Sequence, residues 1–298
     1  MVRTTTTAIR AVLEESLAER DEVVLVGESV GRGGGIGGCT AGLLERFGKD
    51  RVIDVPVADR AAVAFAVGLA LGGKVPVVEL SATGRLPAVL EALSEAVSVA
   101  AADEFRVPMV VRVPYGTEAG DRVDRPLGDL IAAVPGLTVA SGSDPGTVAG
   151  LLRAALDAGG PVVLLEPRVL YSERGETEIE PPSLGAARVV REGDQVTLAA
   201  WGTGVHVAVH AAEDLAEEGV SAGVIDLSSL APLDAATLGA HVQRTGRLVV
   251  VHPDDAGLAE RILRVSLHEA FLYLESPPSS APQTAQAVAK AARASVSY

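Results

Sequence analysis

Short apolar runs alternate with longer amphipathic stretches along the first 175 residues of the chain. The short runs are rich in Val, Ile and Leu and predict strands at residues 23–26, 51–55, 75–80, 109–113, 137–140 and 162–166. The longer stretches predict helices at residues 6–18, 40–47, 60–71, 86–101 and 145–157. Because the strands are apolar throughout and are separated by helices, we expect an α/β fold with a parallel sheet buried on both faces.

This pattern stops at GETEIEPPSLGAA, which contains acids and adjacent prolines and has no hydrophobic period. A second α/β pattern follows, with strands expected at residues 196–200, 222–225 and 248–251 and helices at 205–218, 235–243, 258–270 and 285–294. The sequence therefore predicts two α/β domains, residues 1–175 and 188–298, joined by a linker at 176–187. Asp144 followed by Pro145 predicts the capped start of a helix.

The overall composition restricts the function classes. Hydrophobic residues make up 48% of the chain and charged residues 21%, as in a globular protein. The net charge of −14 argues against binding to nucleic acid or to anionic membranes. The longest apolar run, residues 61–73, is too short to span a bilayer, and acids stand where a signal peptide would be apolar. The single cysteine, Cys39, fits a cytoplasmic protein.

The Gly-rich segment after the first strand matches two general motifs. GESVG at residues 27–31 has the nucleophile-elbow pattern around Ser29, but a helix does not follow it at once. Gly33, Gly35 and Gly38 match the dinucleotide-binding pattern, with Asp54 about 20 residues later as the expected ribose ligand. Five intervening residues separate this pattern from the strand, although the pyrophosphate should meet a helix start there. An NAD-binding oxidoreductase remains an alternative.

The histidines offer a weak metal-site signal. His206 and His210 lie one turn apart on an expected helix, but no other His or Cys stands near them in the sequence. We therefore interpret both as ordinary surface or hydrogen-bonded histidines.

Three longer stretches, at residues 23–80, 107–171 and 193–252, together resemble one family. They contain VVLVGESVGRGGGIGG and RVIDVPVADRAAVAF, VPMVVRVPYG and PVVLLEPRVLY, and TLAAWGTG and GVIDLSSLAPLD. They resemble the β subunit of the decarboxylating (first) component of 2-oxoacid dehydrogenases such as pyruvate dehydrogenase, a relative of transketolase. The resemblance implies a transketolase-like pyrimidine-binding domain at 1–175 and a smaller transketolase C-terminal-like domain at 188–298.

The family uses thiamine diphosphate, and its β subunit binds the aminopyrimidine ring. A carboxylate shares a proton with N1′ of that ring, which activates C2 of the thiazolium toward a 2-oxo acid. The resemblance assigns this position to Asp59, where the family has Glu, and places Glu28 near the cofactor. It also implies cofactor contacts from Arg60, Leu80 and Ser81. Two structural alternatives stay open, because Asp59 could cap the helix at 60–71 and Glu28 could be a solvated acid.

The diphosphate and its Mg²⁺ bind in the family through a G-D-G…N motif. This sequence has no GDG and no Asn at all, so the resemblance implies an α-like partner subunit in an α₂β₂ assembly or, failing that, a β dimer. Where family members have a His that meets the substrate, this chain has Arg122 and Arg125, which could bind a substrate carboxylate or lie in a solvated loop.

The expected function is that of a β-like subunit of a two-chain, thiamine diphosphate-dependent enzyme. The reaction is decarboxylation of a small 2-oxo acid or transfer of a ketol or acyl group. A catalytically degenerate, structural subunit of the same family is the alternative, because the site residues depart from the family pattern.

Overall fold

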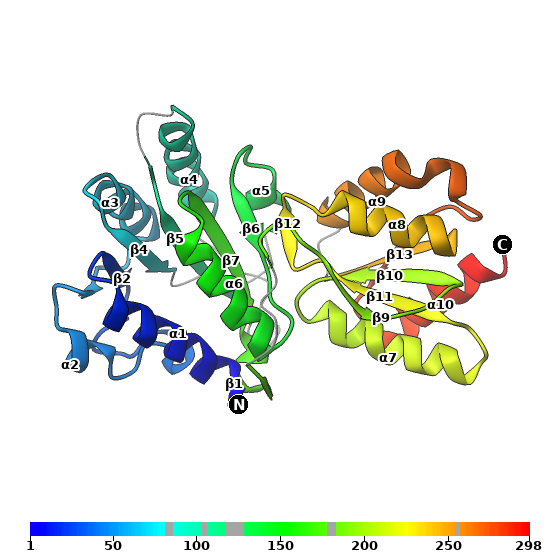
Figure 1. The fold of residues 1–298 in the computed structure, drawn as a ribbon, viewed down its shortest axis with the longest axis horizontal. Coiled ribbons are helices and arrows are strands. Elements are labelled where there is room, and N and C mark those ends of the chain that lie inside the picture. The colour runs from blue at the N-terminus through cyan, green and yellow to red at the C-terminus, as the bar shows by residue number, and fades with distance from the viewer. Residues whose placement is uncertain (81–85, 103–105, 117–127, 178–182, 254–256) are drawn as a thin grey trace. The chain divides into compact units, whose positions relative to one another are not determined.

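The computed structural model describes residues 1–80, 86–102, 106–116, 128–177, 183–253 and 257–298. The chain divides into two compact units, Met1–Leu184 (unit 1) and Gly185–Tyr298 (unit 2) (Figure 1). Each unit has its own sheet with helices packed on both faces. No helix in the described ranges is both long enough and apolar enough to cross a membrane.

A parallel sheet forms the centre of unit 1, as the apolar runs predict. Its strands lie in the order β6-β7-β5-β4-β2-β3, and each neighbouring pair is parallel. The strands are β2 (Val23–Gly27), β3 (Val52–Asp54), β4 (Val75–Glu79), β5 (Met109–Tyr115), β6 (Thr138–Ala140) and β7 (Pro161–Pro167). Burial on both faces explains why these strands are apolar without alternation.

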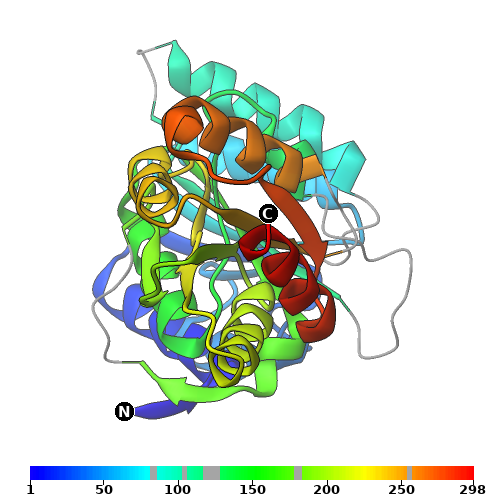
Figure 2. The ribbon, with the colours of Figure 1, turned by 90° about the vertical axis from the view of Figure 1, so that its right-hand side faces the viewer.

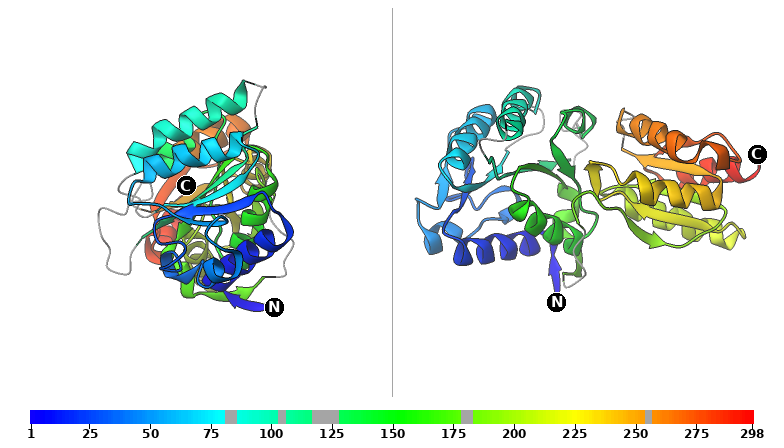
Figure 3. Two further views of the ribbon diagram at one scale, coloured as in Figure 1. Left: turned by 90° about the vertical axis from the view of Figure 1, so that its left-hand side faces the viewer. Right: turned by 45° about the horizontal axis from the view of Figure 1, so that its top comes forward.

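Helices cover both faces of this sheet (Figures 1 and 3). One face carries α1 (Thr5–Glu19), α2 (Leu43–Phe47) and α6 (Pro145–Asp157), and the other carries α3 (Asp59–Leu71) and α4 (Leu86–Ala101). Val23 and Leu25 of β2 belong to the hydrophobic core beneath α1 and α6. Val24 and Val26, the next residues along the strand from each, are also buried but do not belong to that core. A short helix, α5 (Gly128–Ala132), precedes β6.

Local signals set several boundaries. Asp144 accepts a hydrogen bond from the Thr147 N–H at 2.8 Å in a capping box, which confirms the predicted start of α6. The helix expected at 40–47 begins only at Leu43, because Gly42 adopts a left-handed conformation with φ of 82°. A 3₁₀ turn, η1 (Ile36–Gly38), precedes it.

Some elements lack a hydrophobic pattern and are missing from the sequence-based prediction. β1 (Val2–Thr4) and β8 (Arg174–Glu176) form an antiparallel two-stranded sheet, in which Glu176 at the start of the expected linker pairs with Val2. The 3₁₀ helix η3 (Arg168–Ser172) connects β7 to β8.

Unit 2 has a five-stranded sheet in the order β14-β13-β10-β11-β9. The strands are β9 (Arg188–Arg191), β10 (Val196–Ala200), β11 (Ala222–Asp226), β13 (Leu248–His252) and β14 (Ser279–Pro282), and β9 alone of these pairs antiparallel. Figure 2 shows α7 (Gly204–Glu217) and α10 (Ala285–Val296) on one face and α8 (Ala235–Thr245) and α9 (Gly257–Ala270) on the other. Two further short elements are β12 (Ser229–Ala231) and η4 (Phe271–Tyr273).

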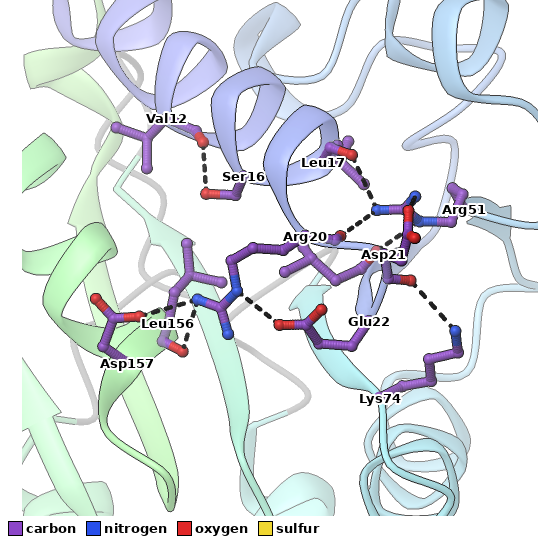
Figure 4. Close-up of polar contacts among 11 residues, drawn as sticks. Val12, Ser16, Leu17, Arg20, Asp21, Glu22, Arg51, Lys74, Leu156 and Asp157 are labelled. Carbon is purple, nitrogen blue, oxygen red and sulfur yellow. Dashed lines mark hydrogen bonds and ion pairs between the residues drawn. The ribbon is translucent and has the colours of Figure 1, made fainter.

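At the amino-terminal end of the unit 1 sheet, two arginines donate hydrogen bonds to the ends of helices (Figure 4). Arg51 donates to the carbonyls of Leu17 and Arg20 at 3.1 and 2.6 Å, which satisfies the last turn of α1. Arg20 in turn donates to the Leu156 carbonyl and to the Asp157 carboxylate at the end of α6. At this end of the sheet, the two arginines are thus engaged in hydrogen bonds that hold helix ends in place. In parallel α/β sheets, ligands bind at the opposite, carboxyl-terminal end.

Candidate functional site

Acidic residues gather at the carboxyl ends of three neighbouring strands of unit 1. Gly27, the last residue of β2, is paired with Asp54 of β3 on one side and with Glu79 of β4 on the other. Glu28 follows Gly27 directly and is half-buried. The structure therefore brings Glu28, Asp54 and Glu79 to one edge of the sheet, where the Gly-rich loop (residues 28–42) begins.

Asp54 fixes the first part of the Gly-rich loop. Its Oδ1 accepts a hydrogen bond from the Gly31 N–H at 2.6 Å, and its Oδ2 accepts one from the Arg32 N–H at 3.1 Å. The dinucleotide layout would need this acid for a ribose and a helix directly after the turn, but the next α-helix begins at Leu43. The loop glycines and Asp54 thus serve the conformation of the loop itself.

Glu79 fixes the middle of the same loop. Its Oε1 accepts a hydrogen bond from the Ile36 N–H at 2.7 Å. A Cβ atom on Gly35 would lie 2.8 Å from this oxygen, and one on Gly37 would lie 2.5 Å from the ring of Tyr171. Because both glycines also have positive φ, larger residues would force the loop away from Glu79 and Tyr171.

A buried arginine lies behind Glu79. Arg112, in the middle of β5, is 1% exposed, and its Nη1 donates to Glu79 Oε2 at 2.7 Å. Its Nε and Nη2 donate to the two oxygens of Glu166 on β7, both at 2.8 Å. The Tyr171 hydroxyl donates to Glu166 Oε2 at 2.6 Å. We call Arg112, Glu79, Glu166 and Tyr171 the Arg112 cluster.

The Arg112 cluster contains two carboxylates and one guanidinium, all buried. Burial raises the pKa of Glu79 above its ordinary value of 4.5, although Arg112 and the Ile36 N–H act to lower it. Both Glu79 oxygens accept hydrogen bonds from N–H donors, an arrangement that favours the carboxylate form. Burial also raises the pKa of the adjacent Cys39 thiol to about 11, so this thiol is neutral at pH 7.

None of the sequence motifs points to the Arg112 cluster. The sequence does contain an indication of a buried ion pair, because Arg112 and Glu166 interrupt the apolar runs MVVRVPY and PVVLLEP of two central strands. Charged residues in such strands are buried only when they are paired.

Asp59 lies in the first turn of α3 and is 6% exposed. It lines a groove of about 560 Å³ between α3 and α4, together with small residues such as Ala61, Ala64, Ala88 and Ala92 and with Glu95. The alternative in which Asp59 is the N-cap residue does not hold, because Ala58 occupies the N-cap position and Asp59 is the first residue of the helix. As the first helical residue, Asp59 places a carboxyl group at the positive end of the helix dipole.

The other expected site residues have different environments. Arg60 lines the same groove as Asp59, but it is exposed and pairs with Glu91 at 3.0 Å. Leu80 is buried, and its N–H donates to the Arg112 carbonyl. Ser81, Arg122 and Arg125 lie outside the described residues.

The two remaining motifs lack supporting geometry. Ser29 has a φ of 59°, but unit 1 contains no histidine that could activate it, because all five lie between His206 and His268. His210 lies 3.4 Å from Glu213. Within the described ranges, no group of three or more His, Cys, Asp and Glu residues could hold a metal ion.

Comparisons with known proteins assign both units. Residues 2–173 match the family model for the transketolase pyrimidine-binding domain, and residues 185–295 match the model for the transketolase C-terminal domain. The chain is 33% identical over 281 residues to the pyruvate dehydrogenase E1 component subunit beta of Acholeplasma laidlawii, covering 91% of this chain and 86% of that one. It is 37% identical over 284 residues to the 3-methyl-2-oxobutanoate dehydrogenase subunit beta of Mycobacterium tuberculosis, covering 91% and 80%.

A solved structure has the same fold. It is described as a split gene transketolase, inactive beta4 tetramer, and matches with a TM-score of 0.80 and 20% sequence identity over 99% of this chain and 98% of that one. The α/β architecture expected from the strand and helix pattern is confirmed in both units.

Proposed function

Since the chain belongs to the family of β subunits of the first component of 2-oxoacid dehydrogenases, we propose that it is the β-like subunit of a two-chain thiamine diphosphate-dependent enzyme. The reaction is decarboxylation of a 2-oxo acid or transfer of the resulting acyl or ketol group. Residues 1–175 form the domain that binds the aminopyrimidine, residues 176–187 the linker, and residues 188–298 the C-terminal domain.

The observation that carries this proposal is the position of Asp59. The residue is 6% exposed, begins a helix and lines a groove formed mostly by alanine side chains, with Arg60 and Glu95 as the other charged residues. A carboxylate in such surroundings fits the task of sharing a proton with a ring nitrogen, because low polarity strengthens the hydrogen bond. Bound thiamine diphosphate supplies the carbon nucleophile, and Asp59 holds the proton at N1′. Leu80 and Ser81 contribute to the ring-binding side, and Arg60 lies beside Asp59.

Glu28 is the second proposed catalytic residue. It follows β2 at the carboxyl edge of the sheet, where ligands bind in folds of this kind. We assign it to proton transfer near the cofactor. Arg122 and Arg125 are proposed to bind the carboxylate of the substrate.

A partner chain completes the site. The sequence contains no Asn and no G-D-G segment, so the diphosphate and Mg²⁺ are proposed to bind to an α-like subunit in an α₂β₂ assembly. The relatives named above act on pyruvate or on 3-methyl-2-oxobutanoate, and we extend only the shared chemistry, a 2-oxo acid, to this chain.

A structural subunit without turnover is the second candidate. It is favoured by the lack of histidine in unit 1 and by aspartate where the family has glutamate. The similar solved structure is itself described as inactive.

The chain co-expressed with an α-like partner distinguishes the two candidates. We expect the complex to retain thiamine diphosphate and to exchange the cofactor C2 proton. Asp59→Asn should slow that exchange by about 10²- to 10⁴-fold, the usual contribution of a positioned acid–base group. Asp59→Glu, which has the residue of the family, should retain it.

Glu95→Gln is the matched control, because Glu95 is a carboxylate in the same groove on α4. It should leave the exchange unchanged. An intact complex without bound cofactor would favour the structural subunit, and an Asp59→Asn variant that exchanges the proton as fast as the parent would overturn the role assigned to Asp59.

A further inference from the structure

The Gly-rich loop connects the Arg112 cluster to the residue that follows Glu28. The Ser29 carbonyl accepts hydrogen bonds from the N–H groups of Gly33 and Gly35 at 3.1 and 3.0 Å. The next N–H group, that of Ile36, donates to Glu79. Consecutive peptide groups of the loop therefore contact Ser29 on one side and Glu79 on the other.

We propose that Glu79 is a positioning residue that fixes the Gly-rich loop, and with it Glu28, through the Ile36 N–H. Glu79 does not touch a reacting group in this account. It acts through a path of three hydrogen bonds, from Arg112 to Glu79, from Ile36 to Glu79, and from Gly35 to Ser29.

The chemistry of Glu79 explains why a carboxylate is needed at this position. One oxygen accepts from Arg112 and the other accepts from Ile36, so both must be acceptors at the same time. A glutamine has one acceptor oxygen and one donor nitrogen, and either orientation of its amide would set two donors against each other. Gln at position 79 can therefore satisfy Arg112 or the loop, but not both.

A buried ion pair is weak evidence for stability, since apolar residues often replace such pairs without loss. The Arg112 cluster has an excess carboxylate, which increases the cost of burial. That excess carboxylate is the one that contacts the loop, which favours a role in positioning.

Protonation of Glu79 acts in the same direction as the glutamine substitution, because the protonated oxygen becomes a donor and a poorer acceptor. The groups that interact electrostatically with it are Arg112 on β5, Glu166 on β7 and the neutral Cys39, and Tyr171, which hydrogen-bonds to Glu166, is also neutral. Because burial raises the pKa of Glu79, the loop should lose this hydrogen bond as the pH falls, before an exposed carboxyl group would be protonated.

Hydrogen exchange of the full-length chain, read by mass spectrometry on peptides covering residues 28–42, tests the proposal. Glu79→Gln should lower the protection of these amides by about ten- to a hundredfold, as expected for loss of a charge-assisted hydrogen bond. In the parent chain the protection factor should fall toward acidic pH, whereas in Glu79→Gln it should not depend on pH.

Glu166→Gln is the matched control. It makes the same change of charge beside the same Arg112, but Glu166 does not contact the loop backbone in the described structure. Equal loosening of the loop in both variants, or none in Glu79→Gln, would overturn the proposal.

The catalytic consequence rests on the function proposed above and is measured separately. In the complex with thiamine diphosphate and Mg²⁺, Glu79→Gln should slow C2-proton exchange. It should also abolish the part of the decrease in exchange rate toward acidic pH that protonation of Glu79 causes in the parent. An unchanged pH profile of the exchange rate would contradict a positioning role. A parent complex that binds no cofactor would contradict the proposed function, and the amide exchange would still decide the role of Glu79.

Discussion

Replacement of Arg112 by Met tests how charge is balanced inside unit 1. The substitution keeps an unbranched side chain but leaves Glu79 and Glu166, each with a 3% exposed side chain, without a cation. Arg112 donates three hydrogen bonds of 2.7–2.8 Å to these carboxylates. Removal of one partner from a buried ion pair costs about 3–5 kcal/mol, and we expect a loss of about 4 kcal/mol in the free energy of unfolding.

Glu79→Gln should behave differently. It changes the cluster from two negative and one positive charge to one of each, while Glu166 keeps both hydrogen bonds to Arg112. We expect a change within about 1 kcal/mol, because the lost hydrogen bond is offset by a lower cost of burying charge. Because the raised pKa of Glu79 makes the folded chain take up a proton more readily than the unfolded chain, this group lowers parent stability as the pH rises above 4.5. The free energy of unfolding of Glu79→Gln should therefore increase relative to that of the parent as the pH rises.

Thermal unfolding followed by circular dichroism measures both effects. At about 2–4 °C per kcal/mol for a domain of this size, Arg112→Met should lower the Tm by roughly 10 °C. Amide exchange in β5 assigns the loss to unit 1, because Trp201, the single tryptophan, lies in unit 2. If Glu79→Gln lowers the Tm as much as Arg112→Met, the charge-balance reasoning is refuted.

Two further substitutions have matched controls. Gly37→Ala should destabilise unit 1 more than Gly38→Ala in thermal unfolding, since both positions have positive φ but only the Gly37 Cβ would meet the Tyr171 ring, at 2.5 Å. Equal losses would mean that this contact is easily relieved. Arg51→Met should cost about 1–3 kcal/mol in urea unfolding because it removes the donor to the last carbonyls of α1 (Figure 4), whereas Lys74→Met, which removes one exposed hydrogen bond nearby, should be nearly neutral. A neutral Arg51→Met would show that water replaces the arginine there.

Most of the longer elements of this fold follow from local sequence. The apolar runs predict the main strands of both units, and most predicted boundaries lie within one or two residues of the observed ones. The reason is that a strand buried on both faces needs a continuous run of apolar side chains. Asp144 and Pro145 define the start of α6 for an equally local reason, since the cap and the first N–H groups lie within one turn. Short pieces such as β1 and β8 could not be predicted, because pairing with a distant segment, and not their own composition, makes them strands.

The sequence motifs and the family resemblance directed attention to the carboxyl ends of the first strands, where Glu28 and Asp59 stand. They could not determine that Asp59 begins its helix as a buried residue, that Asp54 binds the loop backbone, or that Arg112 joins Glu79 and Glu166.

The reason is the distance along the chain between the groups that interact. Arg112 lies 33 positions from Glu79 and 54 from Glu166, and the strands that carry them become neighbours only when the sheet forms. Periodicity records which face of an element is buried. Only the tertiary structure decides which charges meet inside the fold, and therefore which carboxylate is left to contact the loop.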